Sequence, residues 1–210
     1  MSALQHIAHF QDRRDEVPNQ ILAHELASRK DRRGIAEIAE NLWNKDKDIQ
    51  ADCIKVLYEI GYIQPELIAG YVEDFIKLLK SRNNRLVWGG MIALGTVAAL
   101  KPDSIFTHRA DIQKAMDMGS VITVDNGVQT LARAASNGGK YNKAIFPYLL
   151  NHLKTCRPKD VAQHSEKTLP AVVDASNKKE FIAVLEKRMQ DLSGSALTRV
   201  KKVIKAAGDR

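Results

Sequence analysis

The amino-acid sequence predicts an all-α protein in which similar helix pairs stack into a solenoid. Apolar residues recur with a period close to 37, and each is followed four residues later by a second apolar residue, about one helical turn away. Only 12 Gly and 6 Pro occur among 210 residues, too few for the turns of an all-β sandwich. The contents of 44% hydrophobic and 27% charged residues fit a folded chain and exclude a disordered one.

The first helix of each pair carries two apolar ladders. In both ladders the rungs are separated by 37, 37, 37 and 36 residues, and the second ladder lies four residues after the first. Residues four apart share a helix face, so we expect first helices near 35–43, 71–80, 108–118, 144–155 and 180–191. The ladders are Ile38, Phe75, Ile112, Leu149 and Leu185, followed by Leu42, Leu79, Met116, Leu153 and Met189.

A second helix is expected after each first helix. Its first apolar residue recurs at spacings of 37, 38, 37 and 35, and apolar residues seven and eight positions later return to the same stripe. These first apolar residues are Ile49, Leu86, Val124, Val161 and Ala196. A polar side chain one or two positions earlier can accept a free N–H group of the first turn. The predicted caps are Asp48, Asn84, Thr123, Asp160 and Ser195.

Five helix pairs of this size over residues 34–207 resemble the HEAT and armadillo class of repeat proteins. The two-helix unit favours HEAT over the three-helix armadillo unit, and the resemblance implies a right-handed α-solenoid of about five HEAT-like helix pairs. HEAT repeats often place Arg or Lys just after the first apolar residue of the second helix, and this sequence does not. Residues 1–33 lack the period. We expect them to form a divergent N-terminal helical cap before the repeat array of 34–210, within one structural domain.

The resemblance also implies that the second helices line a concave surface on which a partner binds. Positions two, six and nine after the first apolar residue point away from the apolar stripe, because each residue turns the helix by about 100°. An indole offers a flat apolar wall, and side-chain amides pair with N–H and C=O groups of an extended peptide. This surface predicts a non-catalytic site for a protein or peptide. Its candidates are Trp88, Ile92, Asn126, Thr130, Gln163 and Arg133, with Lys167, Arg199 and Lys202 for acidic contacts.

The second helix of the second pair is unusual, because residues 86–100 carry no charge. A helix that is apolar on every side is either buried all round or exposes an adhesive patch. Three glycines in this stretch would allow neighbouring helices to approach closely, which favours burial. The alternative is a binding groove or a homodimer contact centred on Trp88 and Ile92.

Positive charge is concentrated in the last third of the chain. Residues 140–210 contain 15 Lys and Arg against 7 Asp and Glu, a net +8, whereas residues 1–139 contain 17 against 18, a net −1. This asymmetry suits an acidic protein surface or a nucleic-acid backbone. Aromatic residues are scarce there, so base stacking is poorly provided for. Nucleic-acid binding stays an alternative function. Some HEAT-like proteins are DNA glycosylases for alkylated bases, so the resemblance also allows this activity. Its candidate site residues would be Asp125, Arg133 and Trp88.

No recognised catalytic motif occurs: the sequence lacks a Gly-rich phosphate loop, HExxH, CxxC and GxSxG. His6 and His9 lack a third ligand, and Cys53 and Cys156 are expected to pack as small hydrophobic side chains. We therefore expect neither catalysis nor a cofactor or metal. No stretch approaches the roughly 18 uncharged apolar residues of a membrane span. The charged N-terminus is not a secretory signal, so the expected location is cytoplasmic, without a membrane partner.

Overall fold

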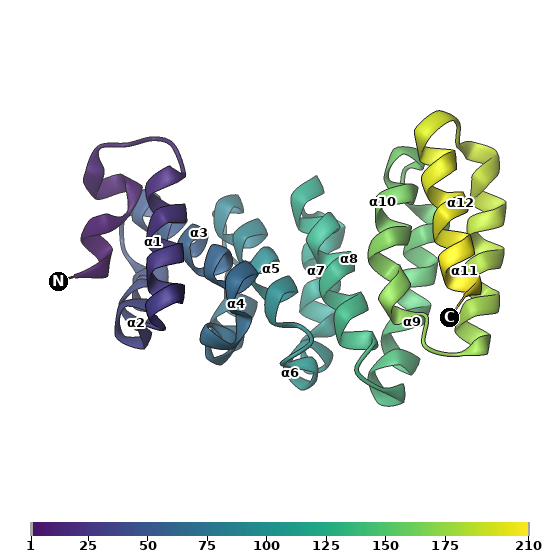
Figure 1. Ribbon diagram of the computed structural model, residues 1–210, viewed down its shortest axis with the longest axis horizontal. Coiled ribbons are helices and arrows are strands. Elements are labelled where there is room, and N and C mark those ends of the chain that lie inside the picture. The colour runs from purple at the N-terminus through teal and green to yellow at the C-terminus, as the bar shows by residue number, and fades with distance from the viewer. Residues whose placement is uncertain (1, 210) are drawn as a thin grey trace.

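The computed structural model describes residues 2–209, and every regular element in that range is a helix. The helix pairs follow one another along an elongated stack with the two ends of the chain at opposite ends (Figure 1). The all-α solenoid is thus confirmed. The first helices are α2 (Arg32–Glu40), α4 (Val72–Leu78), α7 (Arg109–Met118), α9 (Gly139–Thr155) and α11 (Ala175–Arg188). The second helices are α3 (Lys47–Ile63), α5 (Asn84–Val97), α8 (Val121–Ala135), α10 (Pro158–Thr168) and α12 (Gly194–Gly208).

The apolar residues that recur with the repeat period form the hydrophobic core of the stack. All five residues of the first ladder are fully buried, and four residues of the second ladder are buried while Met189 is half-buried. These side chains belong to one continuous cluster that runs from the N-terminal segment to α12. Each unit therefore buries its apolar face against its neighbours, which is how a repeat array acquires a common interior.

The second helices form a continuous row in which each packs against the next. This row begins one helix earlier than the repeat array, because α1 (Val17–Arg29) packs against α3 as α3 packs against α5. Two short 3-10 helices, Ala3–His6 and Ala8–Gln11, precede α1 where a first helix would stand. The N-terminal segment therefore resembles a unit whose first helix is reduced to two turns.

One unit contains three helices instead of two. The short helix α6 (Pro102–Thr107) is followed by His108, and α7 begins at Arg109. The Arg109 guanidinium donates a hydrogen bond of 2.8 Å to the carbonyl oxygen of Phe106, which satisfies the end of α6. Residues 102–135 thus form three helices where a helix pair was expected.

The helix caps lie earlier in the sequence than predicted. Asp46 accepts from the N–H of Asp48 at 2.8 Å, Asn83 from Arg85 at 3.1 Å, and Ser120 from Thr123 at 3.3 Å. No side-chain cap occurs on α10 or α12. The predicted caps Asp48, Asn84, Thr123, Asp160 and Ser195 are therefore wrong. The helices α3 and α5 begin only two residues before Ile49 and Leu86, their first buried apolar residues.

Most of the uncharged stretch in α5 is buried, as its glycines indicated. It packs between α3, α4 and α8, and residues 89–98 are all buried. A Cβ atom added to Gly90 would lie 3.0 Å from the carbonyl oxygen of Phe75, so this helix pair approaches too closely for a side chain. Within residues 2–209, the structure contains no helix with both the length and the apolar character needed to cross a membrane.

A substitution at Gly61 tests whether stability depends on the close approach of α3 and α5. A Cβ atom there would lie 2.9 Å from the Cβ atom of Thr96, which rotation of the Thr96 side chain cannot relieve. We expect Gly61→Ala to lower the free energy of unfolding by about 1–2 kcal/mol, because overpacking outweighs the gain in helix propensity. The control is Gly95→Ala, where the nearest atom would be Thr130 Oγ1 at 3.3 Å. Denaturant unfolding of both variants would contradict the prediction if Gly61→Ala were as stable as the control.

Candidate functional site

A groove opens on the row of second helices at its N-terminal end. Its volume is about 800 Å³, and its walls come from the segment around the second 3-10 helix, from the start of α1, and from α3 and α5. Trp88 lines the groove from α5 and is half-buried. Its ring also contacts the buried ring of Tyr58 on α3, with centroids 6.2 Å apart. The indole is therefore supported by the core and still accessible from the groove.

Polar contacts within the chain hold the walls of this groove. Lys55 forms ion pairs of 2.7 Å with Glu16 at the start of α1 and with Glu59 on its own helix. Burial opposes the charge on Lys55, but the hydrogen bonds to these carboxylates outweigh it and raise the pKa of the lysine. Asp52 accepts a bond of 2.8 Å from the backbone N–H of His9 and another of 2.8 Å from Asn19 Nδ2. These hydrogen bonds thus hold the N-terminal segment against α3.

Two of the predicted groove residues do not face solvent. Ile92 is 8% exposed and Thr130 is fully buried, with its hydroxyl donating to the carbonyl oxygen of Asn126 at 2.8 Å. Their prediction as partner-contacting residues is therefore corrected. Each inner second helix packs against a neighbour on both sides, so the buried arc is wider than the single stripe assumed from the sequence.

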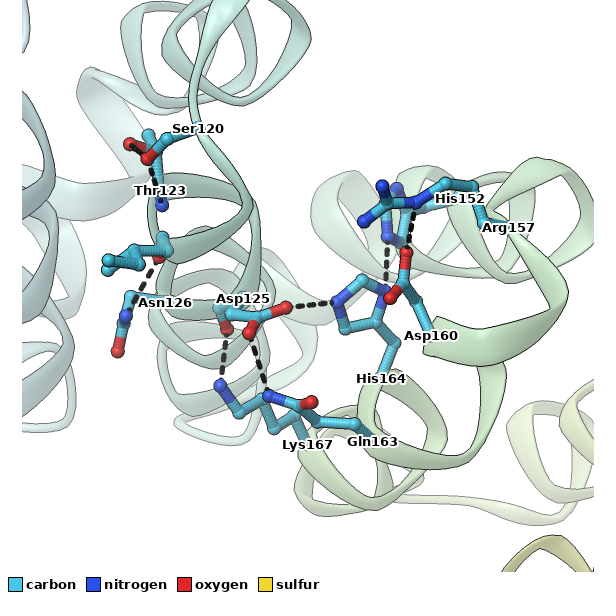
Figure 2. A network of polar contacts seen from close by, with 11 residues as sticks. Ser120, Thr123, Asp125, Asn126, His152, Arg157, Asp160, Gln163, His164 and Lys167 are labelled. Atoms are coloured by element: carbon cyan, nitrogen blue, oxygen red, sulfur yellow. Dashed lines mark hydrogen bonds and ion pairs between the residues drawn. The ribbon is translucent and has the colours of Figure 1, made fainter. Parts of the chain in front are cut away.

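Asp125 on α8 is the centre of a polar network that joins α8 to α10 (Figure 2). Its Oδ2 atom accepts from Gln163 Nε2 at 2.8 Å, its Oδ1 atom lies 2.8 Å from His164 Nε2, and its carbonyl oxygen accepts from Lys167 Nζ at 2.8 Å. Burial lowers the pKa of Lys167 despite the nearby Asp125 carboxylate. Gln163 and Lys167 thus link two repeat units, while Asn126 donates to the carbonyl oxygen of Ile122 on its own helix at 2.8 Å.

Other predicted contact residues also connect neighbouring second helices. Arg133 donates to the carbonyl oxygen of Gly95 at 2.6 Å, which joins α8 to α5. Arg199 forms two bonds to Glu166, of 2.8 and 2.6 Å, which join α12 to α10. Lys202 on α12 is exposed. Several of the predicted contact residues therefore connect neighbouring repeat units.

The three residues considered for a glycosylase site do not converge. Both carboxylate oxygens of Asp125 are engaged by α10, Arg133 binds the backbone of α5, and Trp88 lies against Tyr58 of α3. Each side chain thus points to a different neighbour. The geometry gives no support to a shared catalytic centre made from them.

Sequence analysis missed a cluster of metal-ligating side chains beside the Asp125 network. His152 and Cys156 lie at the C-terminal end of α9, and His164 lies on α10. His152 Nε2 is 2.9 Å from His164 Nδ1, and the ligand atoms of all three residues lie within 4.8 Å of one another. Burial, with a smaller effect from His164, lowers the pKa of His152 to about 4. Burial raises the pKa of the Cys156 thiol, and the nearby Arg188 opposes that shift.

A sequence signal for this cluster existed. His152 and Cys156 are four residues apart on a predicted helix, so they share a face, and His164 follows after the turn to the next helix. By contrast, His6 and His9 belong to no group of three ligand side chains within the described residues.

Several solved structures have a backbone arrangement similar to that of this chain. An engineered protein matches with a TM-score of 0.69 and 17% identity over 100% of this chain and 98% of that chain. A designed armadillo repeat protein in complex with the peptide (KR)4 matches with a TM-score of 0.69 and 14% identity over 90% of this chain and 85% of that chain. The chain has a HEAT/armadillo-like repeat fold. No family model and no curated protein matches this HEAT/armadillo-like chain.

A third solved structure adds to this similarity. Computationally designed armadillo repeat proteins for modular peptide recognition match with a TM-score of 0.68 and 14% identity over 97% of this chain and 98% of that chain. At these low identities, the similarity shows that this HEAT/armadillo-like chain shares the fold of those proteins.

Proposed function

We propose that this chain is a non-catalytic binding protein that holds an extended peptide segment of a partner protein on its second-helix surface. The observation that carries the proposal is the groove of about 800 Å³ with the half-buried Trp88 on its wall. Its volume lies within the usual range of ligand sites, which is about 300–1,000 Å³. An indole supported by the core and open on one side can anchor a hydrophobic side chain, and tryptophan often dominates interface energies.

The groove offers charges of both signs to a peptide backbone and its side chains. Among the described residues, Asp12, Asp48, Arg14 and Arg85 line the groove and make no ion pair within the chain. These groups can contact a polar segment that continues from the side chain anchored on Trp88. A peptide with one large apolar residue and polar flanks on both sides therefore fits the groove.

Charge at the other end of the row favours an acidic extension of the partner. Exposed lysines on α12 add to the net +8 of residues 140–210. The designed armadillo protein mentioned above was solved with the basic peptide (KR)4, whereas the basic third of the present chain would repel such a peptide. We therefore propose an acidic stretch in the segment that reaches α12, and we expect salt to weaken its contribution.

The two tryptophans of the chain allow a matched test. Peptides would be selected on the wild-type protein from a display library, and their affinities measured for Trp88→Ala and Trp43→Ala. Trp43 is 52% exposed at the end of the 3-10 helix Asn41–Trp43, outside the second helices. We expect about tenfold weaker binding for Trp88→Ala and unchanged binding for Trp43→Ala.

A fluorescence titration in a Trp43→Phe background would show whether the peptide reaches Trp88, which is then the remaining indole. Equal affinities for both alanine variants would contradict the proposed groove. Oligonucleotide binding that falls steeply with salt and ignores Trp88→Ala would instead support the nucleic-acid alternative.

A further inference from the structure

We propose that His152, Cys156 and His164 form a binding site for a divalent transition-metal ion such as Zn²⁺, which joins the end of α9 to α10. This site is distinct from the proposed peptide groove, which lies at the other end of the row of second helices. It also assigns Cys156 a role different from the hydrophobic packing expected from the sequence.

The distances suit a tetrahedral ion. With Zn–N of about 2.0–2.1 Å and Zn–S of about 2.3 Å, two nitrogen ligands stand roughly 3.3 Å apart, and nitrogen and sulfur roughly 3.6 Å apart. The two histidine nitrogens are now 2.9 Å apart, and the three ligand atoms lie within 4.8 Å of one another. Side-chain adjustments of about an ångström would bring all three to a common centre.

Asp125 orients one of the ligands. A carboxylate only accepts hydrogen bonds, so the 2.8 Å contact makes His164 Nε2 the donor, and in the neutral ring this leaves the lone pair on Nδ1. This lone pair faces His152 (Figure 2). A histidine whose second nitrogen donates to a carboxylate is the usual arrangement around a metal ligand. Gln163 fixes the same carboxylate through its other oxygen at 2.8 Å, so Asp125 is held on both sides.

The metal ion would take the place of the proton now shared by the two rings. When the His164 ring carries its proton on Nε2 alone, its Nδ1 accepts, and His152 donates from Nε2 across the 2.9 Å contact. Moving the proton of His152 to Nδ1 frees Nε2 for the ion. The Cys156 thiol would lose its proton to solvent when the ion binds; burial disfavours the resulting thiolate, and the nearby Arg188 guanidinium partly offsets this effect. The two positive charges of the ion are thus balanced by the Cys156 thiolate, which would bind it, and by the Asp125 carboxylate, which contacts the ligand His164.

The donor set selects the kind of ion. One thiolate and two imidazoles favour Zn²⁺ and neighbouring transition metals over Mg²⁺ and Ca²⁺, which prefer oxygen ligands. Three protein ligands leave a fourth position of the tetrahedron. Because Cys156 and His152 are only half-buried, water can reach that position.

Cobalt gives a direct spectroscopic test. Chelator-treated protein would be titrated with Co²⁺ while the thiolate-to-cobalt charge-transfer absorption is followed, and Zn²⁺ would then be added. We expect saturation at one equivalent, loss of the absorption when Zn²⁺ displaces Co²⁺, and no competition from Mg²⁺. The absence of a charge-transfer band at stoichiometric Co²⁺ would overturn the proposal.

Variants separate this site from other thiols and histidines. Cys156→Ser should abolish the charge-transfer band, whereas the control Cys53→Ala, which removes the other thiol, should leave the titration unchanged. Asp125→Asn should keep the band and weaken affinity about 10–100-fold, because it perturbs the orientation of His164 and not the ligand set. A band that survives in Cys156→Ser would contradict the assignment.

A measurement on the wild-type protein avoids any folding defect of the variants. Zn²⁺ at one equivalent should slow alkylation of Cys156 at least tenfold, read by mass spectrometry of the peptide that contains it. Alkylation of Cys156 at the same rate with and without Zn²⁺ would count against the site. Far-UV circular dichroism of each variant would confirm that the helices are intact.

Discussion

Replacing Arg188 by methionine is expected to lower the free energy of unfolding by about 3 kcal/mol. The Arg188 side chain comes from the end of α11 and is nearly buried. Its guanidinium donates to the carbonyl oxygens of Leu153 at 2.6 Å and Cys156 at 2.9 Å, where α9 ends. Methionine fills similar space without a donor, and a buried carbonyl that loses its charged donor costs about 1–3 kcal/mol; the part-buried Cys156 contact and the ion pair of Arg188 with Asp191 are lost as well. Denaturant unfolding with an unchanged m-value would measure the loss.

Arg199→Met is the matched control for this prediction. Arg199 also forms a two-bond contact, but its partner is the Glu166 carboxylate and both side chains are exposed. Exposed ion pairs contribute about 0–1 kcal/mol, since water solvates both groups when they separate. A loss for Arg188→Met no greater than that for Arg199→Met would show that the end of α9 does not depend on the buried guanidinium.

The repeat period was the part of the fold that the sequence revealed most completely. Ile38, Phe75, Ile112 and their ladder partners are fully buried because each unit offers the same packing environment to the next. The positions of the first ladder are therefore buried in all five units, and apolar residues recur there. Helix ends do not have this property. Asp46 and Ser120 cap their helices from different offsets, so local chain direction and not the period determines them.

The surface of the second helices was less predictable for a geometric reason. Projection at 100° per residue treats a helix as having one buried side. Inner second helices have neighbours on two sides, which is why Ile92 and Thr130 are buried. The N-terminal wall of the groove, including Asp52 and its bond to His9, depends on the path of a segment outside the period and could not be derived from it.

The period could nevertheless have predicted several contacts between units. Residues about one period apart occupy corresponding positions in neighbouring units and therefore lie side by side. Gln163 meets Asp125 after 38 residues, and Arg133 meets the backbone of Gly95 after 38. Lys140 meets Asp103 after 37 residues. Complementary polar residues at that separation are thus candidates for links within the stack before they are candidates for partner binding.

Lowering the pH from about 6.5 to about 4 is expected to reduce the free energy of unfolding of the metal-free protein by about 2–3 kcal/mol through His152 alone. Burial, with a smaller effect from His164, lowers the pKa of His152 from 6.5 to about 4 in the folded chain. In the unfolded chain, the ring titrates near its ordinary value. Within this window the unfolded chain takes up a proton that the folded chain does not, so acid favours unfolding. Above about pH 6.5 both states are neutral at this residue, and its contribution to stability is fully present.

The charges around His152 set the size of this effect. Asp160, Asp117 and Asp125 favour the protonated ring, but burial and His164 outweigh them. Unfolding free energies measured with a chelator across the window should fall less steeply for His152→Gln, because glutamine keeps a polar group near His164 and does not titrate. His24→Gln, which replaces an exposed histidine on α1, should keep the wild-type slope. Parallel pH profiles for wild type and His152→Gln would mean that the His152 ring does not stay neutral in the folded protein, and that other groups cause its acid sensitivity.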